Sequence, residues 1–378
     1  MKREDGFSLI EMMVTVAILI IIVGTTLASL NQAQQTTQNV ALMADTQENL
    51  RAGLNYMVRD LVQAGEAIPQ GGIPLPNNNG VVNVNKPSPP TLAYKFPTGS
   101  TTLQAITPGF MQGLPTATPN PANNGTTLFG PNNTDMITMI YADNSLIDNT
   151  IPASPHTLSE FPIYLAAAPG NPGCPAGVIA PNGSTVTFDV TCININQGNT
   201  GLHAGDLIMF QNGGGVTLQA ITAVAGQTIT FAAGDAFKLN QTGLPNSTLP
   251  QTAVPPNSGA YPPTTATRIW MVTYYIDSNT NPQRPILMRQ VNFNAAVAVA
   301  EVIENLNVTY DIVNSQATQP AVNAPQLIAP DTPAQIRKVN LLLAARSETA
   351  SGQTRGYFRN NLQTEVSIQS LSFFSQYQ

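Results

Sequence analysis

The chain has 378 residues, of which only 10% are charged, and it carries a net charge of −6 at pH 7 with a sequence pI of about 4.9. This length allows one large domain or two small ones beside an anchor. The acidic balance excludes the basic footprint that direct nucleic-acid binding requires. Proline and glycine number 31 and 28, which predicts a surface rich in turns.

An apolar segment begins close to the N-terminus and runs from Phe7 to Leu30. Its roughly 24 residues would form about 36 Å of helix, enough for one membrane crossing. Glu11 is the only charged residue in it. Because a carboxylate near the centre of a membrane helix costs about 2.5 to 3.5 kcal/mol, Glu11 implies a cationic partner. An α-amino group released by a cut between Gly6 and Phe7 of a neighbouring chain would be such a partner.

Residues Met1 to Leu30 resemble the signal of a type IV prepilin (class III). The resemblance rests on a short charged leader, Gly6 before the cut, the aromatic Phe7 as first mature residue, and Glu11 as the fifth. It implies that a prepilin peptidase removes residues 1–6 and N-methylates Phe7, and that Glu11 neutralises the Phe7 amine of an adjacent subunit. The alternative is a plain signal anchor.

The distribution of cations predicts how the chain crosses the membrane. Lys2 and Arg3 precede the apolar run, and no Lys or Arg follows before Arg51. The positive-inside rule then leaves the N-terminus in the cytoplasm. No small-residue cleavage site follows the apolar run, so the helix stays on the mature protein. We expect a single-pass inner-membrane protein with a periplasmic domain that later reaches the pilus or cell surface.

A second, amphipathic stretch continues the apolar one. Apolar residues recur there at helical spacing, with Gln47 as the break in the series: Val40, Met43, Leu50, Leu54, Met57, Leu61 and Ala64. No proline occurs between Phe7 and Ile68, so one helix of about 87 Å is expected from Phe7 to about Ala64, ended by Gly65 and Pro69. Residues 7–30 would span the membrane, and residues 31–65 would pack on a domain. A solitary coiled coil is the alternative.

The remainder, residues 66–378, is predicted to be a β-rich domain with an inserted β module at about 142–263. Residues Pro69 to about Thr134 are expected to be mostly loop. Strands are expected at Met136–Tyr141, Ser184–Cys192, Asp206–Gln211, Val216–Val224, Gln227–Phe231, Arg268–Ile276, Pro285–Phe293, Leu306–Val313, Ile336–Ala345 and Thr364–Phe373. In the strand around Trp270, Val272 and Tyr274, alternation predicts one inward face. The fold class is therefore α+β and pilin-like, with a long N-terminal helix packed on an antiparallel sheet domain.

The chain contains two cysteines, Cys174 and Cys192, on the side predicted to be periplasmic. Thiols oxidise there, so a disulfide closing a short loop is expected, worth about 3 kcal/mol in the chain-entropy model. The pair lacks Cys-x-x-Cys spacing, and His156 and His203 are the only histidines that could join it. Neither a metal site nor a cofactor is therefore predicted.

Two loops carry motif-like spacing. Asp277, Asn279 and Asn281 are spaced as in a calcium loop, but Pro282 stands where glycine is required and Met288 where the bidentate acid belongs. An Asx-type turn is expected, with calcium as the alternative. Gly213-Gly214-Gly215 is expected to be a hairpin turn, because no Walker-type Lys and Ser or Thr follow it.

Further stretches are similar to the PilW-type minor pilins, which are related to the J-type pseudopilin of type II secretion. They are residues 50–54, 57–65, 135–141, 205–209, 272–276, 285–289, 302–310 and 336–347, in the order expected for that family. By this resemblance Arg51, Arg59 and Asp60 would form the polar face of the long helix. Greater length and a cysteine pair in mid-chain distinguish the sequence from the major pilins.

No catalytic constellation is present: there is no nucleophile elbow, no Walker loop and no paired acids in a shared motif. A structural protein rather than an enzyme is therefore expected. The resemblance implies a minor pilin acting in assembly initiation or the tip complex. Its partners would be the prepilin peptidase, other minor pilins, the major pilin and the inner-membrane assembly platform. The alternatives are a J-type pseudopilin and a pilus-associated adhesin using residues 142–263.

Overall fold

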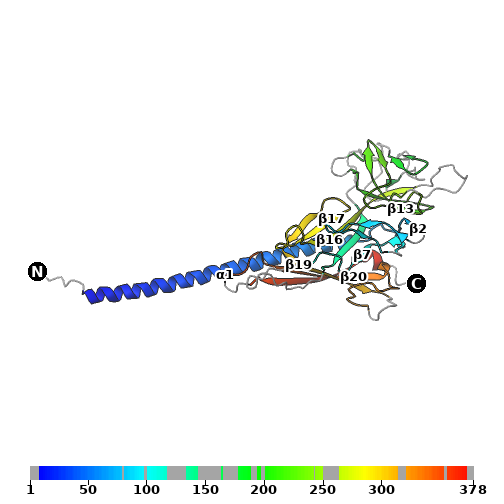
Figure 1. The fold of residues 1–378 in the computed structure, drawn as a ribbon. Helices are drawn as coiled ribbons and strands as arrows, with labels where there is room; N and C mark the ends of the chain where they lie inside the picture. The colour runs from blue at the N-terminus through cyan, green and yellow to red at the C-terminus, as the bar shows by residue number, and fades with distance from the viewer. Residues whose placement is uncertain are drawn as a thin grey trace, which may run out of the picture.

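The computed structural model describes residues 8–78, 81–97, 100–116, 133–143, 163–164, 178–188, 194–196, 201–241, 243–249, 264–313, 321–352 and 356–372. One long helix, α1 (Leu9–Gln63), projects from a β-rich domain (Figure 1). All strand pairs in the described part are antiparallel. The predicted α+β layout of a long apolar helix on an antiparallel sheet domain is confirmed.

The helix α1 ends where the sequence predicts. Its C-cap residue Ala64 has φ −54° and ψ 126°, and Gly65 follows with φ +81°. The Gly65 amide donates to the carbonyl of Ile140 over 2.8 Å, which ties the helix end to the sheet. A Cβ on Gly65 would lie 2.8 Å from the Ala105 Cβ, so both the left-handed backbone and the close contact require glycine here.

The apolar stripe of α1 packs on the domain only in its C-terminal part. Leu50, Leu54, Met57, Leu61 and Ala64 are buried in the main core. The first two members of the predicted stripe, Val40 and Met43, remain 61% and 48% exposed because the domain covers the helix only from about Thr46 onward. The packing prediction is confirmed from Leu50, and it is wrong for Val40 and Met43.

The larger sheet is built around one long strand, β16 (Thr265–Asp277). Its eight strands include β7 (Ile106–Gly109), β8 (Met136–Ala142), β9 (Ile163–Tyr164), β12 (Leu207–Asn212), β13 (Gly215–Ala220), β17 (Ile286–Val291) and β18 (Val297–Glu301). The strand β16 pairs directly with β8, β9, β12 and β17. Sequence analysis missed β18, in which four apolar residues follow one another without the alternation of apolar and polar residues that marks a strand.

Both faces of β16 are buried, so the prediction of a single inward face was wrong. Val272, Tyr274 and Ile276 belong to the core beneath α1. On the opposite face, Ile269 and Met271 belong to a second core shared with β12, β13 and residues of the 73–103 segment. A strand that is covered on both faces lacks the regular alternation of apolar and polar residues from which a single buried face is predicted.

A smaller sheet of three strands lies against the same helix. Its order is β19 (Ile303–Ile312), β20 (Ile336–Arg346), β21 (Arg359–Ser367), with the 3-10 helix η1 (Pro333–Gln335) before β20. The predicted last strand, Thr364–Phe373, was misplaced. The strand starts at Arg359 and ends at Ser367, and the short helix α2 (Gln369–Ser372) follows.

The segment expected to be loop, Pro69–Thr134, contains several very short strands within its described residues. Besides β7 these are β1 (Ile73–Pro74), β2 (Asn77–Asn78), β3 (Val81–Val82), β4 (Asn85–Lys86), β5 (Tyr94–Lys95) and β6 (Thr102–Leu103). Each of these six has two residues, so the expectation of mostly irregular chain holds.

The region at about 142–263 contributes to two sheets. Its strands β10 (Val178–Ile179), β11 (Thr185–Thr187), β14 (Ala223–Ala225) and β15 (Thr228–Thr230) form a separate sheet of order β10-β11-β15-β14. The β12–β13 hairpin instead joins the larger sheet, with Asn212 opposite Gly215 across a two-residue turn, which confirms the predicted glycine turn. The predicted strand Val216–Val224 is divided between β13 and β14. An inserted module with these limits stays a prediction.

Candidate functional site

The N-terminal half of α1 has no cover from the rest of the chain. Every residue from Ser8 to Gln34 is exposed, including large apolar side chains such as Leu9 at 79% and Ile10 at 70%. Leu9–Gln63 is the one helix of the described residues that is long and apolar enough to cross a membrane. Such an apolar surface on a helix requires a membrane or other helices around it.

Glu11 lies in the first turn of α1, where its charge has a favourable position relative to the helix dipole. The carbonyl of Ser8 accepts hydrogen bonds from the amides of Glu11 and Met12 at 3.0 and 3.1 Å. Among the described residues, no cation lies within ion-pair distance of the Glu11 carboxylate. The next basic residue along the helix is Arg51, about 60 Å away at the helical rise. A counter-ion for Glu11 therefore has to come from outside this part of the chain.

The predicted cleavage residues Gly6 and Phe7 lie outside the described residues, so their processing stays a prediction. The threonine hydroxyls within the apolar half are already bonded to their own helix. Thr15 donates to the Met12 carbonyl and Thr25 to the Ile22 carbonyl, both over 2.9 Å. Such bonds allow hydroxyls to sit in an apolar environment.

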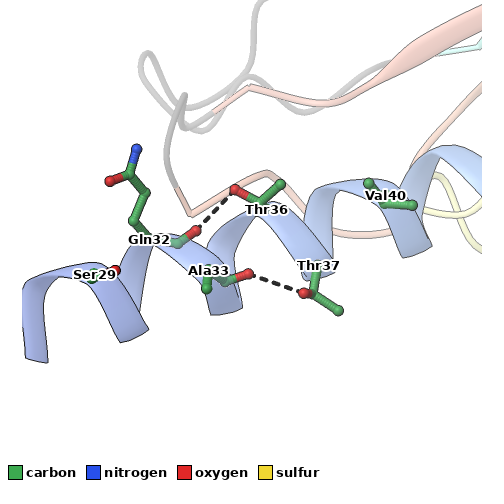
Figure 2. Close-up of a pocket in the computed structure, with 6 residues that line it drawn as sticks. All are labelled: Ser29, Gln32, Ala33, Thr36, Thr37 and Val40. Atoms are coloured by element: carbon green, nitrogen blue, oxygen red, sulfur yellow. Dashed lines mark hydrogen bonds between the residues drawn. The ribbon is translucent and has the colours of Figure 1, made fainter. Parts of the chain in front are cut away.

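A shallow groove of about 540 Å³ follows the surface of α1 just beyond the apolar run (Figure 2). It is lined by Ser29, Gln32, Ala33, Thr36, Thr37 and Val40. Thr36 and Thr37 donate to helix carbonyls four residues earlier, at 2.9 and 3.0 Å, so their hydroxyls are already engaged. With no charged side chain in its lining, the groove offers a packing surface rather than a catalytic or metal-binding site.

A buried polar cluster joins the other half of α1 to the larger sheet. The Asp60 carboxylate is 5% exposed and accepts from the Tyr274 hydroxyl at 2.6 Å and the Tyr141 hydroxyl at 2.9 Å. The Arg289 guanidinium donates to both of its oxygens, at 2.6 and 3.2 Å. The Arg289 guanidinium also lies 6.0 Å from the centre of the Trp270 ring.

The cluster corrects one prediction and shows what sequence reasoning missed. Arg51 and Arg59 are exposed as expected, but Asp60 is buried rather than on the polar face. The spacing in the sequence could have predicted this burial. Asp60 follows Met57 by three residues and precedes Ala64 by four, so it lies within the buried stripe. Its partners come from β8, β16 and β17, which α1 meets only in the folded chain.

The electrostatics of this cluster follow from burial around one carboxylate. Burial and the negative charge of Asp60 raise the pKa of both tyrosines, Tyr141 and Tyr274, above the ordinary value. Burial alone would lower the pKa of Arg289, but its hydrogen bonds to Asp60 and the charge of Asp60 raise it further. Both tyrosines therefore stay neutral donors, and the Arg289 guanidinium stays charged at neutral pH.

A second charged cluster fixes the β20–β21 hairpin beside the middle of α1. Glu304, which is 1% exposed, contacts Arg346 at 3.1 Å and Arg359 at 3.0 Å. The Arg346 guanidinium lies 4.4 Å from the centre of the Tyr357 ring. At the hairpin end, the Ser351 hydroxyl donates to the Asn39 side chain of α1 over 2.9 Å. The hairpin thus reaches the helix nine residues beyond the apolar run.

The loop with calcium-like spacing forms an Asx-type turn, as expected. The Asp277 carboxylate accepts from the amides of Asn279 and Thr280 at 2.9 and 3.2 Å, and from the Thr280 hydroxyl at 2.6 Å. Both carboxylate oxygens are therefore occupied by the turn itself. In the described part of the chain, no three His, Cys, Asp or Glu side chains are grouped to hold a metal.

The predicted disulfide residues Cys174 and Cys192, together with His156, lie outside the described residues, and the disulfide stays a prediction. The other histidine, His203, is 59% exposed, with Nδ1 4.0 Å from an Asp206 oxygen. This geometry leaves His203 at the surface beside a single carboxylate.

Comparison with known proteins yields one match. A family model described as the prokaryotic N-terminal methylation motif matches residues 1–27, the segment that holds the leader, Glu11 and the first turns of α1. No curated protein and no solved structure matches the chain.

Proposed function

We propose that this chain, marked by its N-terminal methylation motif as a type IV pilin-like protein, is a structural minor pilin of the PilW type. In this proposal, prepilin peptidase cuts between Gly6 and Phe7, and the mature chain joins a tip or priming complex with other minor pilins. The major pilin and the inner-membrane platform would be its further partners. No enzymatic role is proposed.

One observation carries the proposal: among the described residues, Glu11 has no counter-ion, and it lies on a helix whose apolar surface none of them covers. The exposed residues from Ser8 to Gln34 have to be covered by lipid or by other helices. Within a helix bundle, a carboxylate needs a cation at the same depth, and the amine of a cleaved neighbouring chain supplies one. Pairing of Glu11 with that amine makes the assembled bundle more favourable than a single helix surrounded by lipid.

The test measures processing and incorporation together. Mass spectrometry of the protein from membranes and from sheared surface filaments should show a chain starting at N-methylated Phe7 in both fractions. Glu11→Ala should be cleaved normally, yet its ratio of filament to membrane protein should fall at least ten-fold, because the neighbouring amine loses its partner.

Glu48→Ala is the matched control, since Glu48 is an exposed acid on the same helix beyond the apolar run. Its incorporation should equal that of the wild type. A retained leader in the wild type, or undiminished incorporation of Glu11→Ala, would contradict the proposal.

A J-type pseudopilin of type II secretion would share the motif and the helix. Deletion separates the two machines: loss of twitching with intact secretion supports the pilus, and loss of secretion with intact twitching supports the pseudopilin. The adhesin alternative draws on a separate hydrophobic cluster, which includes Phe210, Ile229 and Phe231. An adhesin would be indicated if deletion of residues 142–263 abolished surface attachment while filaments were retained.

A further inference from the structure

We propose that the outer edge of β21 is a docking site to which an extended segment of a different protein chain adds as a further strand. The inference goes beyond the proposed function, because it concerns backbone pairing by the domain rather than helix assembly. Strand addition uses free backbone groups along a sheet edge for affinity, and side-chain fit for specificity.

The ladder between β20 and β21 shows which backbone groups are free. Nine residue pairs, from Lys338–Ser367 to Arg346–Arg359, follow without a register shift. At the two ends of this ladder, the Ser347 amide bonds the Phe358 carbonyl at 2.7 Å, and the Ile368 amide bonds the Arg337 carbonyl at 2.9 Å. Antiparallel ladders alternate in pairs, so even-numbered residues of β21 bond β20.

The odd-numbered residues therefore direct their amides and carbonyls away from β20, toward the outer edge: Arg359, Asn361, Gln363, Glu365 and Ser367. The Asn361 amide already donates to the Asn360 side chain over 2.9 Å and is not free. No described strand pairs with this edge, and the sheet order ends at β21. The row of free groups spans nine residues, about 30 Å at the rise of a strand.

The other long edges of the sheet around β16 and of the β19-β20-β21 sheet are covered. Along β19, the Tyr310 amide and carbonyl pair with Ala324, and the Ile312 amide bonds Ala321. Along β13, Thr217 and Gln219 donate their side chains to carbonyls at 246 and 247, and the Ala220 amide bonds Asn240. The strand β18 is short and contains a register shift beside β17. The helix α1 lies against both β18 and β21, and β21 is the long edge along which no described strand pairs.

Proteins usually block an open edge with proline, lysine, a bulge or a covering segment. The stretch Asn360-Asn361-Leu362-Gln363-Thr364 has none of these features and no charge. Its two flanking charges are engaged, Arg359 with Glu304 and Glu365 with Lys338 at 3.8 Å. The edge is thus regular, neutral and unprotected over its middle.

Leu362 shows that the core-facing side of the sheet is incompletely covered at β21. It lies opposite Leu343, a fully buried core residue, and so points to the same face of the sheet. Nevertheless Leu362 remains 39% exposed, because the described residues cover this margin of the sheet only in part. An added strand with an apolar residue beside Leu362 would extend the core by one row.

The direction of β21 decides what kind of chain can add. The loop before β21 meets α1 at Asn39, and the helix after it meets α1 at Ala64, so β21 and α1 run in the same direction. Antiparallel pairing of two copies would point their helices oppositely, which two chains anchored in one membrane cannot do. We therefore assign the edge to an uncharged, extended segment of another protein chain with an apolar residue facing the core side.

Hydrogen exchange of the full-length chain tests the assignment without knowledge of the partner. Exchange is measured at single-residue resolution for the protein purified in detergent and for the protein in native membranes and filaments. The outward amides of Gln363 and Glu365 should exchange at least ten-fold more slowly in membranes or filaments. The inward amides of Leu362 and Thr364 should be protected in every sample and serve as internal controls.

A matched pair of variants sharpens the test. Gln363→Pro removes one outward donor without touching the β20 ladder, as proline is tolerated on edge strands. It should abolish the added protection at Glu365, whereas Gln363→Ala should retain it. Equal exchange in all samples, protection that persists in Gln363→Pro, or protection that appears in purified protein at high concentration would each overturn the proposal. The last result would identify a second copy as the occupant.

Discussion

At the scale of single residues, several charged residues in the described part of the chain are buried in pairs of opposite charge. Charged residues make up 10% of the sequence, yet Asp60, Glu304, Arg346 and Arg268 are each at most 5% exposed. A buried pair contributes little net stability but is costly to break, because the remaining charge has no partner. These pairs therefore hold α1 and the hairpin in one position.

The Asp60 cluster gives a direct prediction. Asp60→Asn keeps the shape of the side chain but leaves Arg289 without a counter-ion, so the free energy of unfolding should fall by about 2 to 4 kcal/mol. Urea unfolding can be followed by the fluorescence of Trp270, the single tryptophan, which lies beside Arg289. Glu48→Gln, an exposed acid on the same helix, is the control. Adding Arg289→Met to Asp60→Asn should recover part of the loss, and equal stabilities of Asp60→Asn and Glu48→Gln would contradict the argument.

Lys86 provides a prediction on pH. Burial lowers its pKa from 10.5 to about 8. Its amine donates to the Gln112 side chain over 2.6 Å and lies 5.9 Å from the centre of the Tyr94 ring. No carboxylate of the described residues is within ion-pair distance of the Lys86 amine. Below pH 8 the folded protein therefore holds a buried charge without a counter-ion.

Between pH 8 and 10.5 the folded state binds fewer protons at Lys86 than the unfolded state, so stability from this group rises with pH. Lys86→Met should raise the free energy of unfolding at pH 7 by up to about 3 kcal/mol, and this advantage should shrink toward pH 10. Lys95→Met, at an exposed lysine nearby in sequence, should give no such pH dependence. A constant difference between Lys86→Met and wild type across this range would refute the assignment.

At the scale of elements, one glycine sets the distance between α1 and the sheets. A Cβ on Gly53 would lie 3.0 Å from Cδ2 of both Leu287 and Leu343, and 3.2 Å from the Ala300 Cβ. These three residues belong to β17, β20 and β18, so Gly53 stands where the helix crosses from one sheet to the other. Glycine mid-helix costs about 1 kcal/mol relative to alanine, and the close packing offsets that cost.

Gly53→Leu should therefore overpack this crossing and reduce the free energy of unfolding by about 1 to 3 kcal/mol, despite the better helix propensity of leucine. Ala44→Leu, at an exposed site on α1, is the control and should be neutral or slightly stabilising. Both are measured by urea unfolding in detergent. A Gly53→Leu protein as stable as Ala44→Leu would show that the helix can shift away from the sheets without cost.

Strand positions were predictable where alternation was strong, as around β8, β12 and β17, and less so at the ends of the domain. The strand β21 was placed too late because its first residues are polar and exposed, and apolar residues after Ser367 suggested continued strand. Its actual limits are set by register with β20, which the local sequence does not encode.

At the scale of the whole molecule, α1 divides the chain into a bare apolar part and a domain-bound part (Figure 1). The cover over α1 starts at about Thr46, and the hairpin contact at Asn39 lies closest to the apolar run. The domain would thus stand about 13 Å above the end of the apolar run, at the rise of a helix. This spacing leaves most of the shallow groove of Figure 2 between the proposed membrane and the domain.

The sequence by itself determined the long helix, its end at Gly65, the antiparallel β class and the position of Glu11 in an apolar run. These features follow from local signals: hydrophobic period, helix breakers and an isolated charge that no nearby residue can neutralise. Only the tertiary structure decided that Asp60 is buried, that β16 is covered on both faces, and that no described strand pairs with the outer edge of β21. Those three facts depend on which distant segments meet, because burial and strand partners are properties of packing and register rather than of local composition.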